Sequence, residues 1–426
     1  HRGSPRLTPL PPDVRMHAEW FYRLRPEAGG HTRAAGLQEN RLGPEMDFAL
    51  TETQEMYRRV ARDFAERELA PQAAAVEEQG QFPWENVRKL AQGEYFGMAV
   101  ALRYGGLGLG ALTSAIILEE ICRCCVNTGA ILQGTMVCAH LLEKYALEPI
   151  RRDYLVPVAR GQAVAAFAAT EPQSGSDINS HTTAAVRDAK DYVLNGRKAF
   201  IGNAVEADFV VVLARTRTEG GHDGFTWVIV DRGTPGYSVG RREKTMGIRA
   251  LSVAEVYFKN VRVPTSNVVG TEGQGLEILS NGLQWANIFL MTEAIGLAQA
   301  ALEASIRYAK ERRSFGVPIS HHQAIQFMIA DMATELEMCR MLSHKAAWLC
   351  DKGLPYDRYA TMLKIAAPDM AMRLTNNAVQ IHGAAGYCQD FPVERYMRQA
   401  RLYSIGEGTS EMHRQALARL IFKEGA

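Results

Sequence analysis

Regular patterning begins near residue 50, where apolar residues recur four or five positions apart: Met56, Val60, Phe64 and Leu69. This spacing predicts an amphipathic helix. Thr51 stands at its N-cap with Gln54 three residues later, which together form a capping box. Similar patterns continue through residues 112–142, interrupted by Pro83 and by a glycine-rich stretch at 105–110. Residues 46–162 are therefore predicted to form an N-terminal α-helical domain.

The period shortens to two after residue 163. Short runs rich in β-branched and aromatic residues occur at 192–194, 209–213, 225–230 and 253–258. Turn residues separate them at Asn195-Gly196, Gly220-Gly221 and Pro235-Gly236. Residues 163–270 are predicted to form a small sheet or β-barrel-like middle domain.

The helical period returns after Gly270 and continues almost to the end of the chain. Glycine and proline predict breaks at residues 316–318, 353–355 and 383–386. Residues 271–426 are thus predicted to be a C-terminal helical domain. The whole chain is expected to be an α+β protein in the order helix, sheet, helix.

Residues 1–45 differ from everything that follows. They contain six prolines and many arginines, with no sustained apolar period. Such a composition does not support a packed core. We expect this segment to be a leader or tag, loosely ordered.

Composition excludes several classes of protein. The 48 Lys and Arg balance the 47 Asp and Glu, so nothing favours binding to nucleic acid. Apolar stretches such as 164–169 are far shorter than the ~20 residues of a membrane span. Seven scattered cysteines and the lack of a recognisable signal peptide favour a cytoplasmic location.

Common nucleotide and metal motifs are missing from the sequence. The glycine-rich stretch at 105–110 does not have the spacing G-x-G-x-x-G and does not follow a predicted strand. Neither a phosphate-binding P-loop motif nor H-E-x-x-H occurs. Cys122, Cys124 and Cys125 would point in different directions on a helix, so inert thiols are favoured and no metal site is expected.

Two stretches carry more chemical information. Residues 167–177 form the end of a strand followed by hydroxyl, glycine and turn residues, which suits a polar ring edge or a phosphate. Residues 403–411 place Glu407 between two glycines, just before a helix that Thr409 or Ser410 would cap. Taken singly, each stretch is better explained as an ordinary turn or a solvated helix entry.

Five ordered motifs give the chain from residue 46 onward a resemblance to the acyl-CoA dehydrogenases. They are Ala169-Thr170-Glu171-Pro172 with Gly175-Ser176-Asp177, Gly196-Arg197-Lys198 with Ile201-Gly202-Asn203, Glu311-Arg312-Arg313-Ser314-Phe315-Gly316 with His322-Gln323, Gln380-Ile381-His382-Gly383 with Gly386-Tyr387, and Glu407-Gly408-Thr409-Ser410-Glu411. The resemblance implies an FAD enzyme with a C-terminal four-helix bundle, assembled as a homotetramer.

The resemblance also assigns residue roles. The flavin ring would lie along Phe167, Ala169 and Thr170 on one side and Phe200, Ile201 and Gly202 on the other, with Gly175 and Ser176 near the pyrophosphate or pantetheine. Other contacts would come from a neighbouring subunit, through Arg312, Ser314, Phe315 and Gln323 for one cofactor and Gln380, Gly383 and Ala384 for another. Thr409 and Glu411 would help to hold the flavin.

The implied reaction is dehydrogenation of an acyl-CoA to the trans-2-enoyl thioester. Glu407 would remove the α-proton, and the β-hydride would pass to flavin N5. An electron-transfer flavoprotein or another acceptor would then reoxidise the cofactor.

Departures from the family pattern keep alternatives open. The helix around residues 277–296 usually presents an acidic residue and an Arg to the substrate, and here these places hold Gln284 and Asn287. That loss favours an acyl group bound to a carrier protein. A flavin oxidase or monooxygenase is a further alternative, against which Glu407 counts. Glu293 is the next candidate for the base.

Overall fold

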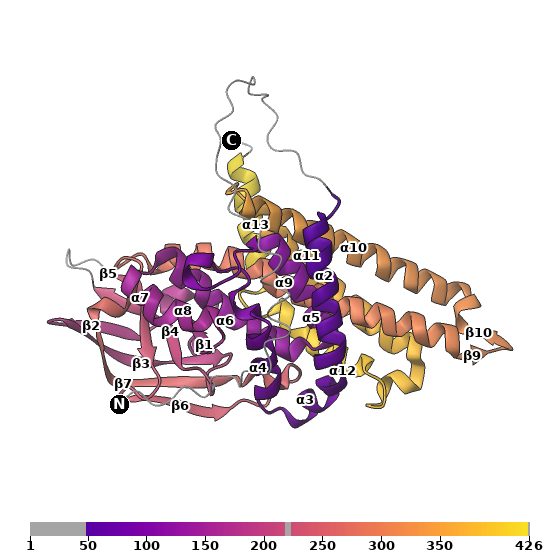
Figure 1. Ribbon diagram of the computed structural model, residues 1–426, viewed down its shortest axis with the longest axis horizontal. Coiled ribbons are helices and arrows are strands. Elements are labelled where there is room, and N and C mark those ends of the chain that lie inside the picture. The colour runs from indigo at the N-terminus through magenta and orange to yellow at the C-terminus, as the bar shows by residue number, and fades with distance from the viewer. Residues whose placement is uncertain (1–47, 218–222, 425–426) are drawn as a thin grey trace, which may run out of the picture.

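The computed structural model describes residues 48–217 and 223–424, which form helices, then a sheet, then helices (Figure 1). The predicted α+β order is therefore confirmed. The sheet lies at one end of the molecule, and the long C-terminal helices extend away from it. The expectations for residues 1–45 and for the turn at Gly220-Gly221 lie outside the described residues.

The helices before the sheet bury most of their apolar residues against one another. They are α2 (Glu52–Phe64), α3 (Ala73–Gln79), α4 (Trp84–Gln92), α5 (Gly110–Cys124), α6 (Val126–Tyr145), α7 (Glu148–Ile150) and α8 (Val156–Ala159). The predicted capping box of α2 is confirmed, because Gln54 N–H donates to Thr51 Oγ1 at 3.2 Å and Thr51 N–H to Gln54 Oε1 at 2.9 Å. The glycine-rich stretch is a loop that leads into α5.

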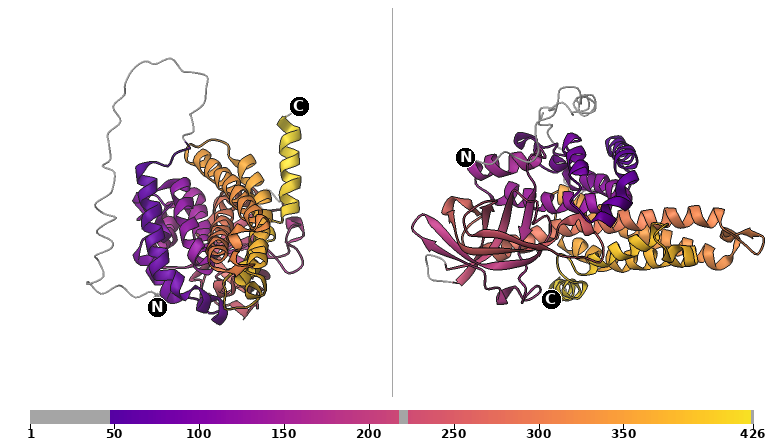
Figure 2. Two further views of the ribbon diagram at one scale, coloured as in Figure 1. Left: turned by 90° about the vertical axis from the view of Figure 1, so that its right-hand side faces the viewer. Right: turned by 90° about the horizontal axis from the view of Figure 1, so that it is seen from below.

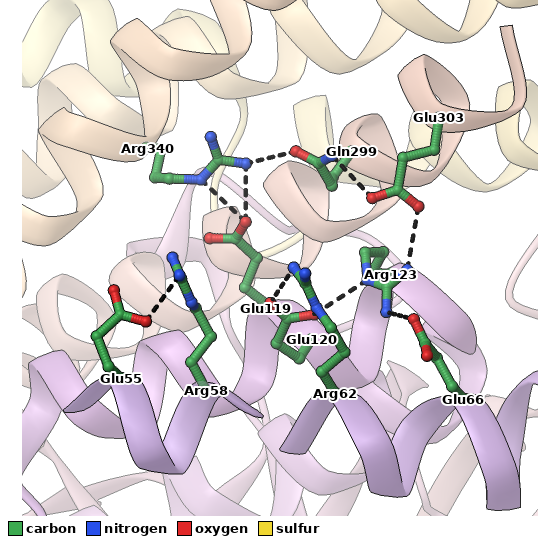
Figure 3. Close-up of polar contacts among 10 residues, drawn as sticks. All are labelled: Glu55, Arg58, Arg62, Glu66, Glu119, Glu120, Arg123, Gln299, Glu303 and Arg340. Atoms are coloured by element: carbon green, nitrogen blue, oxygen red, sulfur yellow. Dashed lines mark hydrogen bonds and ion pairs between the residues drawn. The ribbon is translucent and has the colours of Figure 1, made fainter. Parts of the chain in front are cut away.

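A network of charged side chains joins α2 and α5 to the C-terminal helices (Figure 3). Arg62 on α2 donates two hydrogen bonds to the buried Glu120 on α5, at 3.0 and 2.8 Å. Arg123, almost fully buried, contacts Glu120 and also Glu66 and Glu303 at 2.6 and 3.0 Å. Because each buried charge has an opposite partner, the network links the two helical segments without an unpaired ion.

Replacing Arg123 with Met is expected to destabilise the fold by about 3 kcal/mol, since it leaves Glu120 buried with one fewer cation. The measurement is denaturant unfolding followed by circular dichroism. Arg58→Met is the control, because Arg58 is exposed and its pair with Glu55 spans only one turn of α2. That variant is expected to cost less than ~1 kcal/mol. Equal losses in the two variants would contradict a special role for the buried network.

Strands β1 to β8 form one sheet. They are β1 (Ala165–Ala168), β2 (Ala184–Asp188), β3 (Asp191–Ile201), β4 (Phe209–Arg217), β5 (Asp223–Asp231), β6 (Tyr237–Arg242), β7 (Ala254–Pro264) and β8 (Val268–Val269). The order is β6-β7-β3-β2-β4-β5-β8, and β1 pairs in parallel with β4. No pairing closes this path among the described strands, so the barrel-like form is not confirmed.

The prediction of a turn at Asn195-Gly196 is wrong. These residues lie inside β3, where the register to β7 shifts between Leu194 and Gly196. The chain instead reverses between Asp188 and Asp191, which pair with each other. Asn-Gly is common in tight turns, but glycine also occurs at β-bulges. A Cβ at Gly196 would lie 2.6 Å from the Thr183 backbone, so the close approach of a neighbouring chain explains the glycine.

The C-terminal segment contains three long helices, α9 (Gly275–Glu311), α10 (Gln323–Asp351) and α11 (Asp357–His382), with the shorter α12 (Val393–Ala400) and α13 (Ser410–Glu424). Their breaks fall where glycine and proline predicted them. A small hairpin of β9 (Arg313–Ser314) and β10 (Val317–Pro318) joins α9 to α10 at the far tip (Figure 2).

The expected C-terminal four-helix bundle is not confirmed as such. Helices α9, α10 and α11 pack along one another, α5 from the first segment packs on α9 and α10, and α13 packs on α11. Helix α9 is long and apolar enough to span a membrane, and 89% of its most apolar window is buried inside the protein. This burial is typical of a core helix.

Candidate active site

The end of β1 is fixed by a buried ion pair. Lys198 on β3 donates to Glu171 Oε1 at 2.9 Å and to the Ala169 carbonyl at 2.7 Å. Glu171 also accepts from the N–H groups of Thr182 and Thr183. Burial raises the pKa of Glu171, but these hydrogen bonds outweigh it and hold the pKa well below its usual range. The pair therefore sets the position of residues 169–171.

The end of β3 and the turn that follows it are held in an unusual backbone conformation. Phe200 and Asn203 have φ of +57° and +61°, a region that residues with a side chain seldom occupy. Asn203 is buried, and its Nδ2 donates to the Ile131 carbonyl on α6 at 3.1 Å. Backbone strain of this kind is commonly retained at functional sites.

Glu407 reaches the same part of α6. Gln133, two residues after Ile131, donates from Nε2 to Glu407 Oε1 at 3.0 Å. Residues 131–133 of α6 thus connect the Asn203 turn with the carboxylate. The structure thus brings the Asn203 turn and Glu407 to the same part of α6, although they are more than 200 residues apart in the sequence.

The Glu407 residue is half-buried, and its carboxylate is incompletely paired, with a buried Oε2. Its backbone φ is +55°, and its Oε2 has no hydrogen-bond partner among the described residues. Burial raises the pKa of Glu407, whereas the hydrogen bond from Gln133 and the charge of Lys364 oppose the rise. An oxygen without a partner and a raised pKa are properties of a proton acceptor.

Glu293 lies behind this site on α9 and is fully buried. The Tyr403 hydroxyl donates to its Oε2 at 3.4 Å, and its Oε1 has no partner among the described residues. Burial raises the pKa of Glu293 well above the usual carboxyl value, and the nearby Glu407 adds to the rise. As a whole residue, Glu407 is the more exposed of the two.

The proposed flavin residues near the sheet present both apolar and polar groups. Phe200 is 69% exposed, and the Thr170 hydroxyl has no hydrogen-bond partner within the described part of the chain. Phe167, Ala169 and Gly202 are half-buried, and Gly175 and Ser176 are exposed. Ile201 is buried in the sheet core, so only its backbone can contact a ligand there.

These residues fit a flat aromatic cofactor with a polar edge. The exposed Phe200 ring and the apolar end of β1 provide surface for a ring system, and the unpaired Thr170 hydroxyl provides a hydrogen-bonding group. Thr409 caps α13, where its Oγ1 accepts from Met412 N–H at 3.3 Å, and Glu411 is exposed on the first turn.

Other predicted cofactor residues lie far from this place. Ser314 and Phe315 belong to the hairpin at the tip of the long helices, opposite the sheet (Figure 1). Phe315 is 95% exposed. Arg312 and Gln323 flank that hairpin and are exposed, as are Gln380, Gly383 and Ala384 at the end of α11. A single chain does not bring the hairpin and the sheet together.

Asn287 was expected to face the polar part of a substrate. In the structure its side chain is fully buried, and both of its polar atoms lack partners among the described residues. Gln284 is half-buried and accepts from Thr361 Oγ1 at 3.4 Å. A buried amide without partners is uncommon in a native protein.

Sequence patterns gave no role to three residues that organise the site: Gln133, Lys198 and Lys364. A signal existed for Lys364, which occupies a helical face otherwise formed by Ala360, Leu363 and Ala367. A lysine on such a face is almost never buried unless it is paired. Gln133 carried no comparable signal, because its partner Glu407 is distant in the sequence.

Comparison with known proteins identifies the family of this chain. The acyl-CoA dehydrogenase N-terminal, middle and C-terminal domains match residues 51–162, 166–261 and 273–422. The short-chain specific acyl-CoA dehydrogenase of Clostridium acetobutylicum is 40% identical over 89% of this chain and 100% of its own length.

Solved structures give the same result. Butyryl-CoA dehydrogenase from Megasphaera elsdenii is 34% identical with a TM-score of 0.85, over 88% of this chain and 100% of its own. The prolyl acyl carrier protein oxidase AnaB is 29% identical with a TM-score of 0.84, over the same shares. The chain therefore belongs to the acyl-CoA dehydrogenase family, whose members are oxidoreductases that use FAD.

Proposed function

We propose that this protein dehydrogenates a short acyl-CoA to its trans-2-enoyl thioester, with Glu407 as the base for the α-proton. The observation that carries the proposal is the Glu407 carboxylate, which has one buried oxygen without a partner among the described residues and lies beside the Asn203 turn. The most similar relatives described above act on short acyl chains by name.

The α-proton of a thioester is weakly acidic, so the base must be basic enough to remove it. Burial supports this requirement, because it disfavours the charged carboxylate and raises the pKa of Glu407. Gln133 orients the group by donating to one oxygen. The other oxygen remains free to accept the proton.

Negative charge develops on the thioester carbonyl as the proton leaves, and a hydrogen-bond donor must stabilise it. The backbone N–H of Glu407 has no acceptor within residues 48–217 and 223–424. We assign it one hydrogen bond to the carbonyl oxygen. The positive φ at Glu407 and Gly408 is compatible with an N–H group that turns outward instead of pairing with a preceding carbonyl.

FAD, when bound, supplies the acceptor for the β-hydride. We propose that Phe167, Ala169 and Thr170 hold one side of its ring, and Phe200, Gly202 and the Ile201 backbone the other. Gly175 and Ser176 would lie by the pyrophosphate. Thr409 and Glu411 would contact the flavin from the start of α13.

We further propose a homotetramer in which neighbouring subunits complete each cofactor site. The support is the distance between the hairpin and the sheet in one chain, together with exposed apolar side chains on the hairpin, on α10 and in the turn after α11: Phe315, Phe327, Met338 and Tyr387. Arg312, Ser314, Phe315 and Gln323 would serve one neighbour, and Gln380, Gly383 and Ala384 another. An electron-transfer flavoprotein is the proposed acceptor.

A second candidate is dehydrogenation of an acyl group on a carrier protein. The unpaired, buried Asn287 in place of the family's Arg favours it, because Asn cannot supply the charge-assisted hydrogen bonds of a guanidinium. The similarity to a carrier protein oxidase is consistent with it. A flavin oxidase or monooxygenase is disfavoured by the presence of Glu407.

The decisive experiment is anaerobic reduction of the purified flavoprotein by matched pairs of thioesters, each acyl group presented on CoA and on a carrier protein. Bleaching of the flavin by butyryl-CoA, with formation of the 2-enoyl product, is the expected result. A preference of tenfold or more for the carrier thioester, about 1.4 kcal/mol in transition-state binding, would favour the second candidate. No reduction by any thioester would contradict both.

A further inference from the structure

Lys364 on α11 is a fully buried lysine in the interior behind Glu407. Its Nζ donates to the carbonyl of Tyr403 at 2.7 Å and to the carbonyl of Gly408 at 2.9 Å. Burying an ammonium group is costly unless it is hydrogen-bonded, so these two contacts account for its position. Both acceptors belong to one short stretch of chain.

The two carbonyls lie on either side of Glu407. Tyr403 precedes the base by four residues, and Gly408 follows it directly. Between them the backbone adopts φ of +55° at Glu407 and +96° at Gly408. A left-handed conformation at a glutamate persists only where the surrounding structure imposes it. The lysine joins the two ends of the segment that must bend in this way.

The charge of Lys364 also acts on the base. Burial lowers the pKa of the ammonium to about 8, and Glu407 opposes this change. In return, the positive charge favours the ionised form of Glu407. Lys364 therefore holds the turn through two hydrogen bonds and also provides a counter-charge for the carboxylate.

Other titratable groups lie near the Glu407 turn, on the helices that pack around it. His413 on α13 has its Nε2 3.3 Å from the Glu407 carbonyl, and burial lowers its pKa. Glu293 on α9 and Cys122 on α5 lie on the Tyr403 side, and burial raises the pKa of both, which favours their neutral forms. Among these groups, Lys364 is the one that bonds to both ends of the turn.

We propose that Lys364 is a positioning residue for the base, which holds the Glu407 turn through the Tyr403 and Gly408 carbonyls and places a positive charge beside the carboxylate. The inference rests on the proposed function of Glu407. It predicts that removing the lysine alters both the rate of proton abstraction and its dependence on pH.

Two variants separate the effect of the hydrogen bonds of Lys364 from the effect of its charge. Lys364→Gln keeps N–H donors without a charge, and Lys364→Met removes both. Flavin reduction by the best acyl-CoA is expected to be at least about tenfold slower in Lys364→Met at neutral pH, with a smaller loss in Lys364→Gln. In both variants the acid limb of the rate–pH profile should move to higher pH, because the base has lost its counter-charge.

Lys345→Met is the matched control, since it removes a half-buried lysine from the neighbouring helix α10, where Lys345 stacks on Tyr359. It should leave the rate and the pH limb unchanged. If Lys364→Met and Lys364→Gln retain the parental rate and pH limb, the proposal is overturned. If Lys364→Gln reduces the flavin more slowly but its acid limb stays at the parental pH, the proposal is also overturned, because only a structural role remains. If Lys364→Met does not fold, the result for Lys364→Gln decides.

Hydrogen exchange of residues 403–409 tests, independently of catalysis, whether Lys364 holds the turn. Lys364→Met should exchange faster there than the parent, while α9 and the sheet remain unchanged. Unaltered exchange in residues 403–409 would overturn the proposal that Lys364 holds the turn. If no thioester reduces the parental flavin, the proposed function fails, and this measurement still decides whether Lys364 holds the turn.

Discussion

Replacement of Glu407 with Gln is expected to lower the rate of flavin reduction by acyl-CoA by ~10² to 10⁴, or more because the carbon acid is weak. The amide is nearly the same shape, and its oxygen can still accept the hydrogen bond from Gln133. Fold and FAD content should therefore be preserved. Stopped-flow absorbance of the flavin under anaerobic conditions measures the effect.

A second prediction about Glu407 concerns how the rate of flavin reduction by the parental protein depends on pH. Glu407 must be ionised to accept the proton, and burial raises its pKa. The rate should thus rise with pH through a limb that lies above the ordinary carboxyl range, and Glu407→Gln should lose that limb. Glu293→Gln is the informative comparison, because Glu293 is buried and its raised pKa favours the neutral form. A rate within a few-fold of the parent is expected for it, and the reverse result would identify Glu293 as the base.

Mixing two inactive variants is expected to restore activity. In the proposed homotetramer, Arg312→Glu should abolish flavin binding at the neighbouring subunit's site, because it reverses the charge of a proposed contact to the anionic cofactor. Glu407→Gln inactivates the subunit's own site. When the two are dissociated and reassembled together, some sites combine an intact Glu407 from one chain with an intact Arg312 from another. Random pairing across a twofold interface predicts recovery of about a quarter of parental activity.

Each variant taken alone through the same dissociation and reassembly is the control and should stay inactive. Arg312 suits this test because its side chain is exposed and makes no hydrogen bond or ion pair within the described residues. The fold should therefore tolerate the change. If the mixture remained inactive while both variants reassembled into oligomers, each site would be built from one chain.

The sequence allowed the order of the segments to be predicted because it depends on local periodicity. The breaks between the long helices and the cap of α2 follow from residues within a few positions of one another. The Asn195-Gly196 error has a different origin. A glycine required by close approach of the Thr183 backbone looks the same in sequence as one required by a turn.

The candidate site was predictable only in part for the same reason. Thr170 and Glu407 lie in short motifs with turn and cap residues around them, which local patterns can reveal. Gln133 and Lys364 act through partners that are 274 and about 40 residues away, and no local pattern links them. The burial of Asn287 likewise depends on which helices surround α9.

Helix α9 has a consequence for mixed populations of subunits. Its first residue accepts a hydrogen bond from Trp227 in the sheet, at 2.9 Å, and its last residue leads directly into the hairpin. Its 37 residues correspond to about 55 Å, so its length fixes how far the hairpin stands from the sheet. One residue inserted in the last turn would advance the hairpin by about 1.5 Å and rotate it by about 100°. In the proposed homotetramer, such a chain would keep its own base but damage its neighbour's cofactor site. Its defect would then be dominant when it is coexpressed with the parental chain.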